Sequence, residues 1–173
     1  MSEANNLEIS GDDVVISGIA GSFPEAINID ELKEKLFDKV KFVKNCENFN
    51  WNKDNLAVPN FIGRMSRHDK FDVSFFGINK KQCDDMNSMI RNIMERSYEA
   101  IIDAGLSPED VKNTRMGVMI GSSISESEVT KIVLGQFIHE YGIMGHNRAF
   151  FANRVSYWFN SHGAIPYADN KTA

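Results

Sequence analysis

The sequence predicts an α/β fold with a largely parallel sheet, because strand-like runs alternate with segments of helical periodicity. Residues 14–20 and 116–120 are the two strand-like runs, since both are rich in apolar residues and both are followed by glycine. Between them, residues 87–104 place apolar side chains at three- and four-residue steps, the spacing of a helix with one buried face. This alternation favours helices layered over a sheet.

The first part of the chain predicts a tail, a strand and a helix. Residues 1–12 lack apolar periodicity and are expected to form a disordered tail, so that the domain covers residues 13–173. Residues 14–20 predict a buried strand, and Asp30 is expected to cap the helix that follows. The apolar face of that helix is expected to hold Leu32, Leu36 and Phe37. Residues 38–69 have an irregular pattern, which predicts a long surface excursion with short elements.

The middle of the chain carries the clearest helix signals. The helix at 87–104 is expected to end at Gly105, and Ser107 with Pro108 predicts a short helix with a serine cap. Residues 116–120 predict the second strand, closed by residues 121–123.

The last part of the chain predicts two more helices and the start of a third strand. A helix near Ser127 is expected to point Val129, Ile132, Val133 and Phe137 inward. Asn147 is expected to cap the second helix, which ends at Gly163 and buries Phe150, Phe151, Val155, Trp158 and Phe159.

Composition argues against several classes of protein. The net charge of −5 argues against nucleic-acid binding, because phosphate binding needs concentrated positive charge. No apolar run approaches the roughly 20 residues of a membrane helix, and the acidic start lacks the features of a secretory signal. Cys46 and Cys83 are the two cysteines, and their spacing suggests neither a disulfide framework nor a zinc site. We therefore expect a soluble cytoplasmic protein with free thiols.

Two short segments resemble catalytic or binding turns only in part. Gly18 and Gly21 follow a strand-like run, but the third glycine of a nucleotide-binding turn is missing, so a tight structural turn is favoured. Residues 121–125 (GSSIS) are placed like the nucleophile elbow of a hydrolase, although Ser125 stands where an elbow needs glycine. A serine nucleophile also needs a histidine base, and the sequence does not place His68, His139, His146 or His162 beside these serines. A turn with a helix cap is the favoured interpretation.

The remaining polar and aromatic clusters favour structural roles. The four histidines have no short paired spacing, which argues against a metal site. Asp84 and Asp85 lack the pattern of a calcium loop and are interpreted as the acidic start of a helix. The aromatic cluster before that helix is expected to be core and consists of Phe71, Phe75, Phe76 and Ile78. A run of lysines is expected to be a solvated face, with a docking patch for an acidic partner as the alternative; it consists of Lys33, Lys35, Lys39, Lys41 and Lys44.

Several motifs occur in a fixed order between residues 13 and 169. They are VVISGIAGSFPEA, FDVSFFGI at 71–78, Met86 with Arg91 and Glu95, YEA and DAG within 98–105, GV at 117–118 followed by GSS at 121–123, and ANRVSYW at 152–158. In this order they resemble the N-terminal half of the β-ketoacyl synthases of fatty acid and polyketide synthases. Their wording is most like that of animal type I fatty acid synthases.

The resemblance implies a fold, a reaction and partners. The family has the thiolase-like fold, with two similar α/β halves that form a five-layered sandwich in a homodimer, and this chain resembles most of the first half only. The family reaction is the decarboxylative condensation of malonyl-carrier with a Cys-bound acyl chain, assisted by two histidines. The resemblance therefore implies an acyltransferase whose partner is an acyl carrier protein bearing phosphopantetheine thioesters. No cofactor or metal is implied.

The chain departs from the family pattern where the nucleophile is expected. The family cysteine lies in the motif Asp-(Thr/Ser)-Ala-Cys. An alignment without gaps puts Thr172 in its position, and with two inserted residues Thr172-Ala173 would precede a cysteine further on. Both histidine motifs belong to the second half of the family domain, and Cys46 and Cys83 match no catalytic position. We therefore expect no catalytic residue in this chain, and we expect the isolated chain to be inactive. Asn87 replaces the usual aspartate of the long helix but keeps the ability to cap it.

Three interpretations stay open. The first is a fragment of a fatty acid synthase ketosynthase, truncated before the active-site cysteine, which predicts a reading frame that continues with cysteine at 174 or nearby. The second is a degenerate, non-catalytic interaction module derived from a ketosynthase. The third is a polyketide synthase ketosynthase fragment, which N-terminal motifs discriminate poorly from the first.

Overall fold

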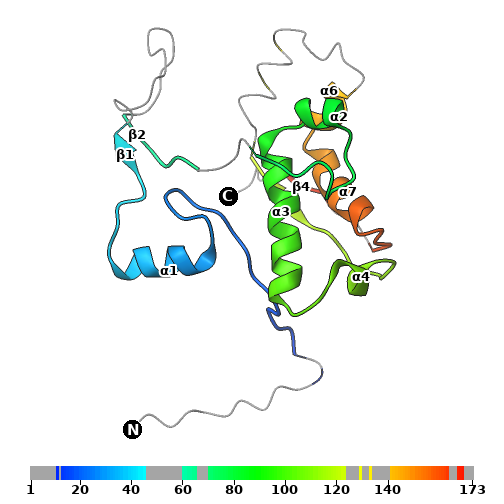
Figure 1. Ribbon diagram of the computed structural model, residues 1–173, viewed down its shortest axis with the longest axis horizontal. Coiled ribbons are helices and arrows are strands. Elements are labelled where there is room, and N and C mark those ends of the chain that lie inside the picture. The colour runs from blue at the N-terminus through cyan, green and yellow to red at the C-terminus, as the bar shows by residue number, and fades with distance from the viewer. Residues whose placement is uncertain are drawn as a thin grey trace.

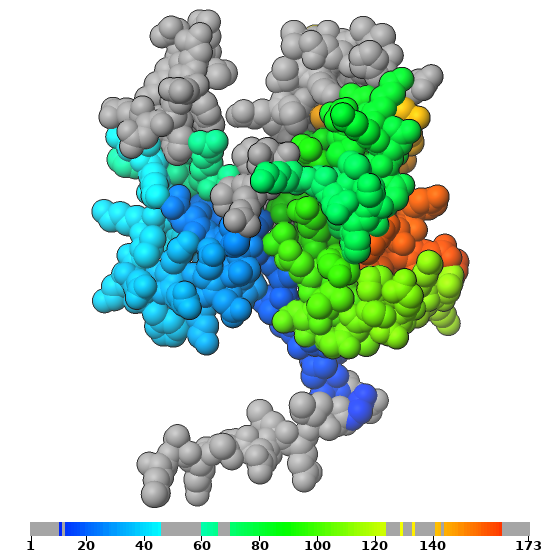
Figure 2. Space-filling model, viewed as in Figure 1, coloured from blue at the N-terminus to red at the C-terminus, as the bar shows by residue number. Residues whose placement is uncertain are grey.

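The computed structural model describes residues 11, 13–45, 60–65, 70–123, 129, 133, 141–163 and 167–169. The helices in these residues are α1 (Ile29–Phe37), α2 (Lys80–Asp84), α3 (Ser88–Asp103), α4 (Pro108–Val111), α6 (Gly142–His146) and α7 (Ala149–Trp158). The strands are β1 (Lys44–Asn45), β2 (Phe61–Ile62), β3 (Ile120–Ser122) and β4 (Tyr167–Asp169). In Figure 1, α3 runs through the middle of the molecule, with α1 and β1 on one side and α2, α4, α6 and α7 on the other. Figure 2 shows the same division as two masses of side chains that meet beside α3.

Helix α3 confirms the predicted central helix at both ends. The side-chain oxygen of Asn87 accepts a hydrogen bond from the backbone N–H of Met89 at 2.9 Å, so the residue that replaces the family aspartate still caps the helix. At the other end, Gly105 adopts a φ of +76° directly after the C-cap. The short helix α4 is also as predicted, because Ser107 and Asp110 form a capping box and Pro108 occupies the first turn.

Helix α1 begins two residues earlier than the predicted cap requires. Asn28, with extended backbone, is the N-cap, and its side-chain oxygen accepts from the N–H of Glu31 at 2.8 Å. Asp30, the predicted cap, lies inside the first turn, where a negative charge favours the helix dipole. The predicted apolar face is also mostly uncovered, because Leu36 and Phe37 are exposed.

The prediction of a buried strand at 14–20 is wrong. This segment has no strand pairing, and Val14, Val15, Ile16 and Ile19 are all more than half exposed. Its backbone runs along the end of α3 instead, where the N–H of Ile19 donates to Oδ2 of Asp103 at 2.8 Å. A Cβ on Gly18 would lie only 2.1 Å from the carbonyl oxygen of Ala100, so the glycine permits this close approach. β-branched residues favour a strand only when a neighbouring strand completes the ladder of hydrogen bonds.

The strands form two small sheets. β1 and β2 pair antiparallel, as short elements within the predicted surface excursion. β3 and β4 pair parallel, with Ile120 opposite Tyr167 and Ser122 opposite Asp169, which confirms the expected parallel pairing and the expected third strand. The second strand was predicted at 116–120, but the ladder covers Ile120–Ser122, because its partner begins only at Tyr167.

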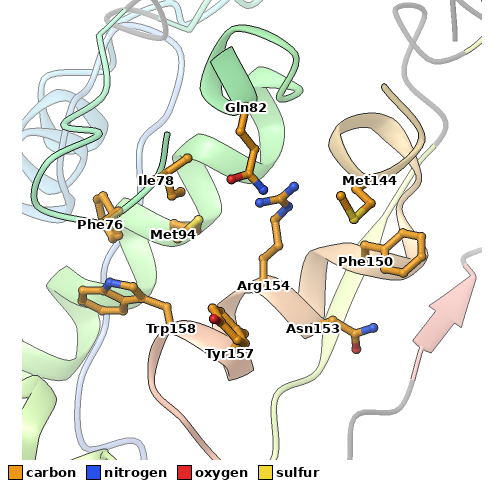
Figure 3. Close-up of a pocket in the computed structure, with 11 residues that line it drawn as sticks. Phe76, Ile78, Gln82, Met94, Met144, Phe150, Asn153, Arg154, Tyr157 and Trp158 are labelled. Carbon is orange, nitrogen blue, oxygen red and sulfur yellow. The ribbon is translucent and has the colours of Figure 1, made fainter. Parts of the chain in front are cut away.

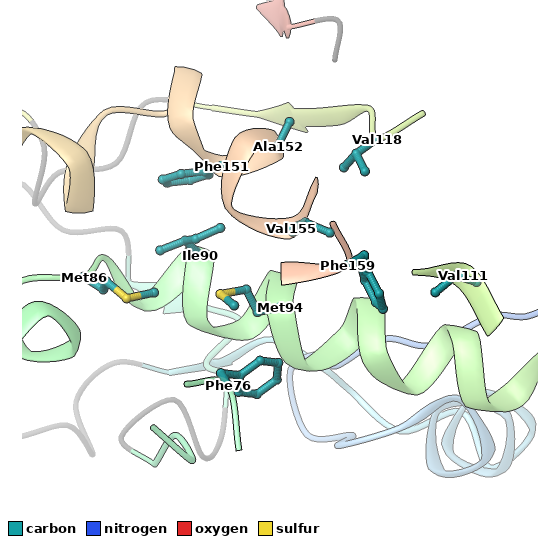
Figure 4. Close-up of a cluster of buried hydrophobic side chains, with 10 residues drawn as sticks. All are labelled: Phe76, Met86, Ile90, Met94, Val111, Val118, Phe151, Ala152, Val155 and Phe159. Atoms are coloured by element: carbon teal, nitrogen blue, oxygen red, sulfur yellow. The ribbon is translucent and has the colours of Figure 1, made fainter. Parts of the chain in front are cut away.

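The hydrophobic core lies between α3 and α7, as Figure 4 shows. Phe151, Phe159 and Ile90 are its largest fully buried side chains. The side-chain oxygen of Asn147, the predicted cap, accepts from the N–H of Ala149 at 3.0 Å, but the N-cap of α7 is Arg148, whose side chain makes no capping hydrogen bond. The helix ends at Trp158, however, and Gly163 lies beyond it against the backbone of Met116.

The aromatic cluster at 71–78 confirms the core prediction for most of its members. The rings of Phe71 and Phe76 stack at 4.8 Å, and Phe76 is buried. Phe75 is nearly half exposed, although its ring contacts Tyr98 edge-on at 4.9 Å.

Two other predictions fall wholly or mostly outside the described residues. The tail at 1–12 does so except for Gly11. Of the helix expected near Ser127, the structure describes Val129 and Val133, which are helical but exposed, so these two side chains do not point inward as predicted.

Candidate functional site

The carboxyl edge of the β3–β4 sheet lies next to the position where the family resemblance puts the nucleophilic cysteine. Ligands of α/β sheets bind beyond the carboxyl ends of parallel strands. β3 ends at Ser122 and β4 at Asp169, so both strands lead to this edge, and Thr172 follows three residues after β4 outside the described residues. Nη1 of Arg148 donates to the carbonyl oxygen of Ser122 at 3.4 Å. The edge therefore joins the start of α7 to the end of β3.

In the elbow pattern of residues 121–125 the nucleophile position is Ser123, which is exposed directly after β3, and the residues that would complete the turn, 124–128, lie outside the described residues. Gly121 and Ser122 belong to β3 itself, and the Ser122 side chain is buried. Of the candidate histidines, His146 is buried in α6 and His162 is exposed after α7, whereas His68, His139 and Ser125 lie outside the described residues. The favoured interpretation of this segment as a turn with a helix cap therefore stays a prediction, since most of the turn lies outside the described residues.

Cys83, Gly18 and Gly21 lie in closely packed positions. Cys83 is a free thiol in α2 and is only 5% exposed, and Cys46 lies outside the described residues. Gly18 and Gly21 lie in neither a turn nor a bend, so the predicted tight turn is not formed. Their close contacts are with Ala100 and with the ring of Phe23.

The acidic pair differs from its prediction, whereas the lysine run is largely a solvated face as predicted, because Lys33, Lys39, Lys41 and Lys44 are exposed. Asp84 ends α2 and Asp85 is its C-cap, so the pair follows a helix end instead of opening a helix. In the described parts of the chain, no group of three or more His, Cys, Asp or Glu side chains is placed to hold a metal ion. Within the lysine run, Lys35 pairs with Glu31 at 3.3 Å and Lys44 with Glu25 at 2.7 Å, which offsets part of its positive charge.

A pocket of about 490 Å³ opens between α2, α3, α6 and α7 (Figure 3). Arg154 reaches from α7 across it toward Gln82 of α2. With the Gln82 amide turned so that its oxygen faces the guanidinium, that oxygen accepts from Nη1 at 3.0 Å and from Nη2 at 3.2 Å. Burial lowers the pKa of Arg154, because the apolar surroundings disfavour its charge.

The sequence prediction did not single out Arg154, although a signal was present. Phe150, Arg154 and Trp158 follow one another at four-residue steps, which places a cation on the apolar face predicted for α7. A charge on a buried helix face usually has a specific partner or function.

A second, polar cavity separates the segment before α1 from α3. Arg96 forms the centre of its contacts, since Nη1 donates to the carbonyl oxygen of Ile27 at 3.2 Å and lies 2.7 Å from a carboxylate oxygen of Glu99. Ser22 donates to the side-chain oxygen of Asn92 at 3.1 Å across the same cavity. Burial is the main cause that raises the pKa of Glu95; Glu99 adds to the rise, whereas Arg96 and Arg91 oppose it. These contacts tie the N-terminal segment to α3.

Replacing Glu95 with glutamine is expected to raise the free energy of unfolding at pH 7 by less than about 1 kcal/mol. A raised pKa means that the folded chain binds this proton more tightly than the unfolded chain does. The ionised side chain therefore costs stability at neutral pH, and the cost disappears as the pH falls below the ordinary value of 4.5. Urea unfolding at pH 7 and at about pH 4 measures both effects. Glu99→Gln is the matched control and is expected to destabilise at pH 7, because Arg96 loses its nearest carboxylate; a loss of stability in Glu95→Gln would contradict the prediction.

Comparisons with known proteins show which family this architecture represents. Residues 11–169 match the family model described as the beta-ketoacyl synthase N-terminal domain. The chain therefore belongs to the β-ketoacyl synthase family. Among the described residues, no helix has the length and apolar character needed to cross a membrane.

The relatives include fatty acid and polyketide synthases. The chain is 38% identical over 152 residues to a fatty acid synthase of Anser anser anser, which covers 88% of this chain and 43% of the relative. It is 30% identical over 169 residues to the polyketide synthase PksM of Bacillus subtilis strain 168, which covers 88% of this chain and 4% of that protein. The chain thus spans less than half the length of either relative.

Solved structures of ketosynthases have the same fold. The ketosynthase domain OzmH KS7 of Streptomyces albus JA3453 superposes with a TM-score of 0.74 at 22% identity, over 90% of this chain and 28% of that one. The ketosynthase of module 6 of the bacillaene synthase from Bacillus subtilis 168 gives 0.68 at 23% identity, over 90% and 26%. These likenesses confirm the thiolase-like fold predicted for the chain. The chain corresponds to the N-terminal part of that fold only.

Proposed function

We propose that this chain forms the first half of a ketosynthase domain in fatty acid synthesis, where the complete domain condenses malonyl-carrier with a Cys-bound acyl chain. The observation that carries the proposal is the 38% identity to a fatty acid synthase across 88% of the chain. The motif ANRVSYW also supports the proposal. It forms most of α7, and α7 packs on α3 and leads the chain toward β4.

This half of the domain would hold the catalytic residues in place and would not itself supply them. A nucleophilic cysteine must expose its sulfur to the carrier thioester, and thiolates react where the surroundings favour their charge. Cys83 lacks the first of these properties, since its side chain is buried in α2. The carboxyl edge of β3 and β4 supplies a fixed platform beside which the nucleophile and its histidines would be held.

We further propose the partners that this reaction requires. An acyl carrier protein bearing phosphopantetheine thioesters would deliver both substrates, and the complete enzyme would act as a homodimer in the cytoplasm. By its reaction, the complete enzyme would be an acyltransferase, with no metal or cofactor of its own.

Acyl transfer to the purified chain 1–173 is expected to remain at background when it is incubated with radiolabelled acyl-carrier protein. If the reading frame continues through an Asp-(Thr/Ser)-Ala-Cys motif, the same assay on the longer product is expected to give one thioester per chain. Cys83→Ser is the control and is expected to change neither result. Stoichiometric labelling of 1–173 that Cys83→Ser abolishes would overturn the assignment of the nucleophile.

A polyketide synthase is the second candidate, favoured by the match to the polyketide synthase PksM. Assays on the longer polypeptide discriminate a fatty acid synthase from a polyketide synthase. We expect the first to accept saturated acyl chains, and the second to extend β-keto or hydroxyl intermediates as well. A longer transcript without the cysteine motif would instead favour the non-catalytic interaction module.

A further inference from the structure

The pocket between α2, α3, α6 and α7 has no role in the proposed condensation, and its size and lining are those of a binding site. None of its described lining residues belongs to β3, so the pocket and the β3 end of the sheet edge are formed by different residues. A volume of about 490 Å³ falls within the roughly 300–1,000 Å³ range of small-molecule sites.

The walls of this pocket are mostly apolar. Phe76 and Met94 are buried beneath it, and Trp158 contributes an aromatic wall. Figure 3 shows Met144 and Phe150 on the side opposite Phe76 and Trp158, with the Arg154 side chain between the two groups. An apolar tail of a ligand therefore has surface to contact on both sides of the guanidinium.

Among the described residues of the lining, Arg154 alone carries a charge, and its partner there is neutral. Its partner is the neutral amide of Gln82, and its Nε has no hydrogen-bond acceptor. Among the residues that the structure describes, no carboxylate lies within ion-pair distance of it. A half-buried guanidinium of this kind favours an anion, because charge-assisted hydrogen bonds to a planar carboxylate strengthen as water is excluded.

We propose that this pocket binds a monocarboxylate with an apolar tail. One guanidinium offsets one negative charge, which favours a monoanion over a phosphate-sized dianion. The apolar walls then select molecules whose remaining surface is hydrocarbon or aromatic. This site does not depend on the proposed condensation, since none of its described lining residues belongs to β3.

Decanoate, below its micelle concentration, is the probe for this site. The chain contains two tryptophans, Trp51 and Trp158, so Trp51→Phe leaves Trp158 as a fluorescent reporter in the pocket wall. Saturable quenching or a spectral shift of Trp158 is expected with decanoate. Decan-1-ol, which keeps the tail and lacks the charge, is expected to bind about tenfold or more weakly, and decylammonium more weakly still.

Two variants test the role of the charge. Arg154→Gln is expected to weaken decanoate binding about tenfold or more and to leave decan-1-ol unchanged. Gln82→Glu keeps the arginine but gives it an internal carboxylate, and is expected to weaken decanoate binding similarly. Arg115→Gln, an exposed arginine outside the lining, is the matched control and is expected to change nothing.

Several outcomes would overturn the proposal. Equal affinity for decanoate and decan-1-ol, tighter binding of decylammonium, or no saturable response of Trp158 would each do so. Unchanged decanoate affinity in a folded Arg154→Gln would also do so. If circular dichroism shows that Arg154→Gln does not fold, Gln82→Glu decides, and unchanged affinity in that variant overturns the proposal.

Discussion

Replacing Phe151 with alanine is expected to lower the free energy of unfolding by about 3–5 kcal/mol. Phe151 is 1% exposed and lies on the face of α7 that packs against Ile90 of α3 (Figure 4). Truncation removes most of a fully buried aromatic side chain, and the cavity left behind adds to the lost transfer free energy because the neighbouring helices relax only in part.

Urea unfolding, followed by circular dichroism, measures this effect, and Phe150→Ala provides a matched control. Phe150 precedes Phe151 in the same helix but is half-buried and faces the pocket, so its loss is expected to cost only about 1 kcal/mol. Equal losses for the two variants would show that α7 does not pack on α3 in solution as described.

Replacing Gly163 with alanine is expected to destabilise the fold by about 2 kcal/mol or more and to disturb the β3–β4 pairing. A Cβ at this position would lie 2.1 Å from the carbonyl oxygen of Met116 and 2.6 Å from the N–H nitrogen of Gly117. These are backbone atoms, which cannot move aside by rotating a side chain. The segment that leads into β4 would have to shift away from the segment that leads into β3.

Hydrogen exchange at Ile120–Ser122, together with urea unfolding, distinguishes the two parts of this expectation. Gly11→Ala is the control, because a Cβ at Gly11 meets nothing within 4 Å and is expected to leave both measurements unchanged. Retained protection of the β3 amides in Gly163→Ala would contradict the close approach of the two segments.

Helix α3 could be predicted accurately from the sequence because its signals are local. Apolar spacing, the capping residue Asn87 and the glycine at 105 all act within one or two turns of the residues that they organise. The state of residues 14–20 could not be predicted by the same reasoning, since a strand forms only with a partner that lies far away in the sequence. The start of β3 likewise depends on β4, which lies more than 40 residues further along the chain.

The site was predicted less completely than the fold. The motif ANRVSYW indicated the family and predicted the buried positions of α7, but the role of Arg154 depends on Gln82, which lies on another helix. Contacts of this kind arise from the packing of α2 against α7, and no spacing within either helix encodes them. The sequence also placed the acidic pair at a helix start, because α2, with only five residues, carries too weak a periodicity to predict.

The uncovered segment at 14–20 has a practical consequence for any work with this chain. Val14, Val15 and Ile16 expose their side chains in extended backbone, within a run of seven residues that carries no charge and no proline. Such a run is a template for cross-β stacking between molecules, since no strand of the described chain pairs with it; the N–H of Ile19 is already taken, because it donates to Asp103. A lysine at Val15 would act as a gatekeeper there without touching the α3–α7 core.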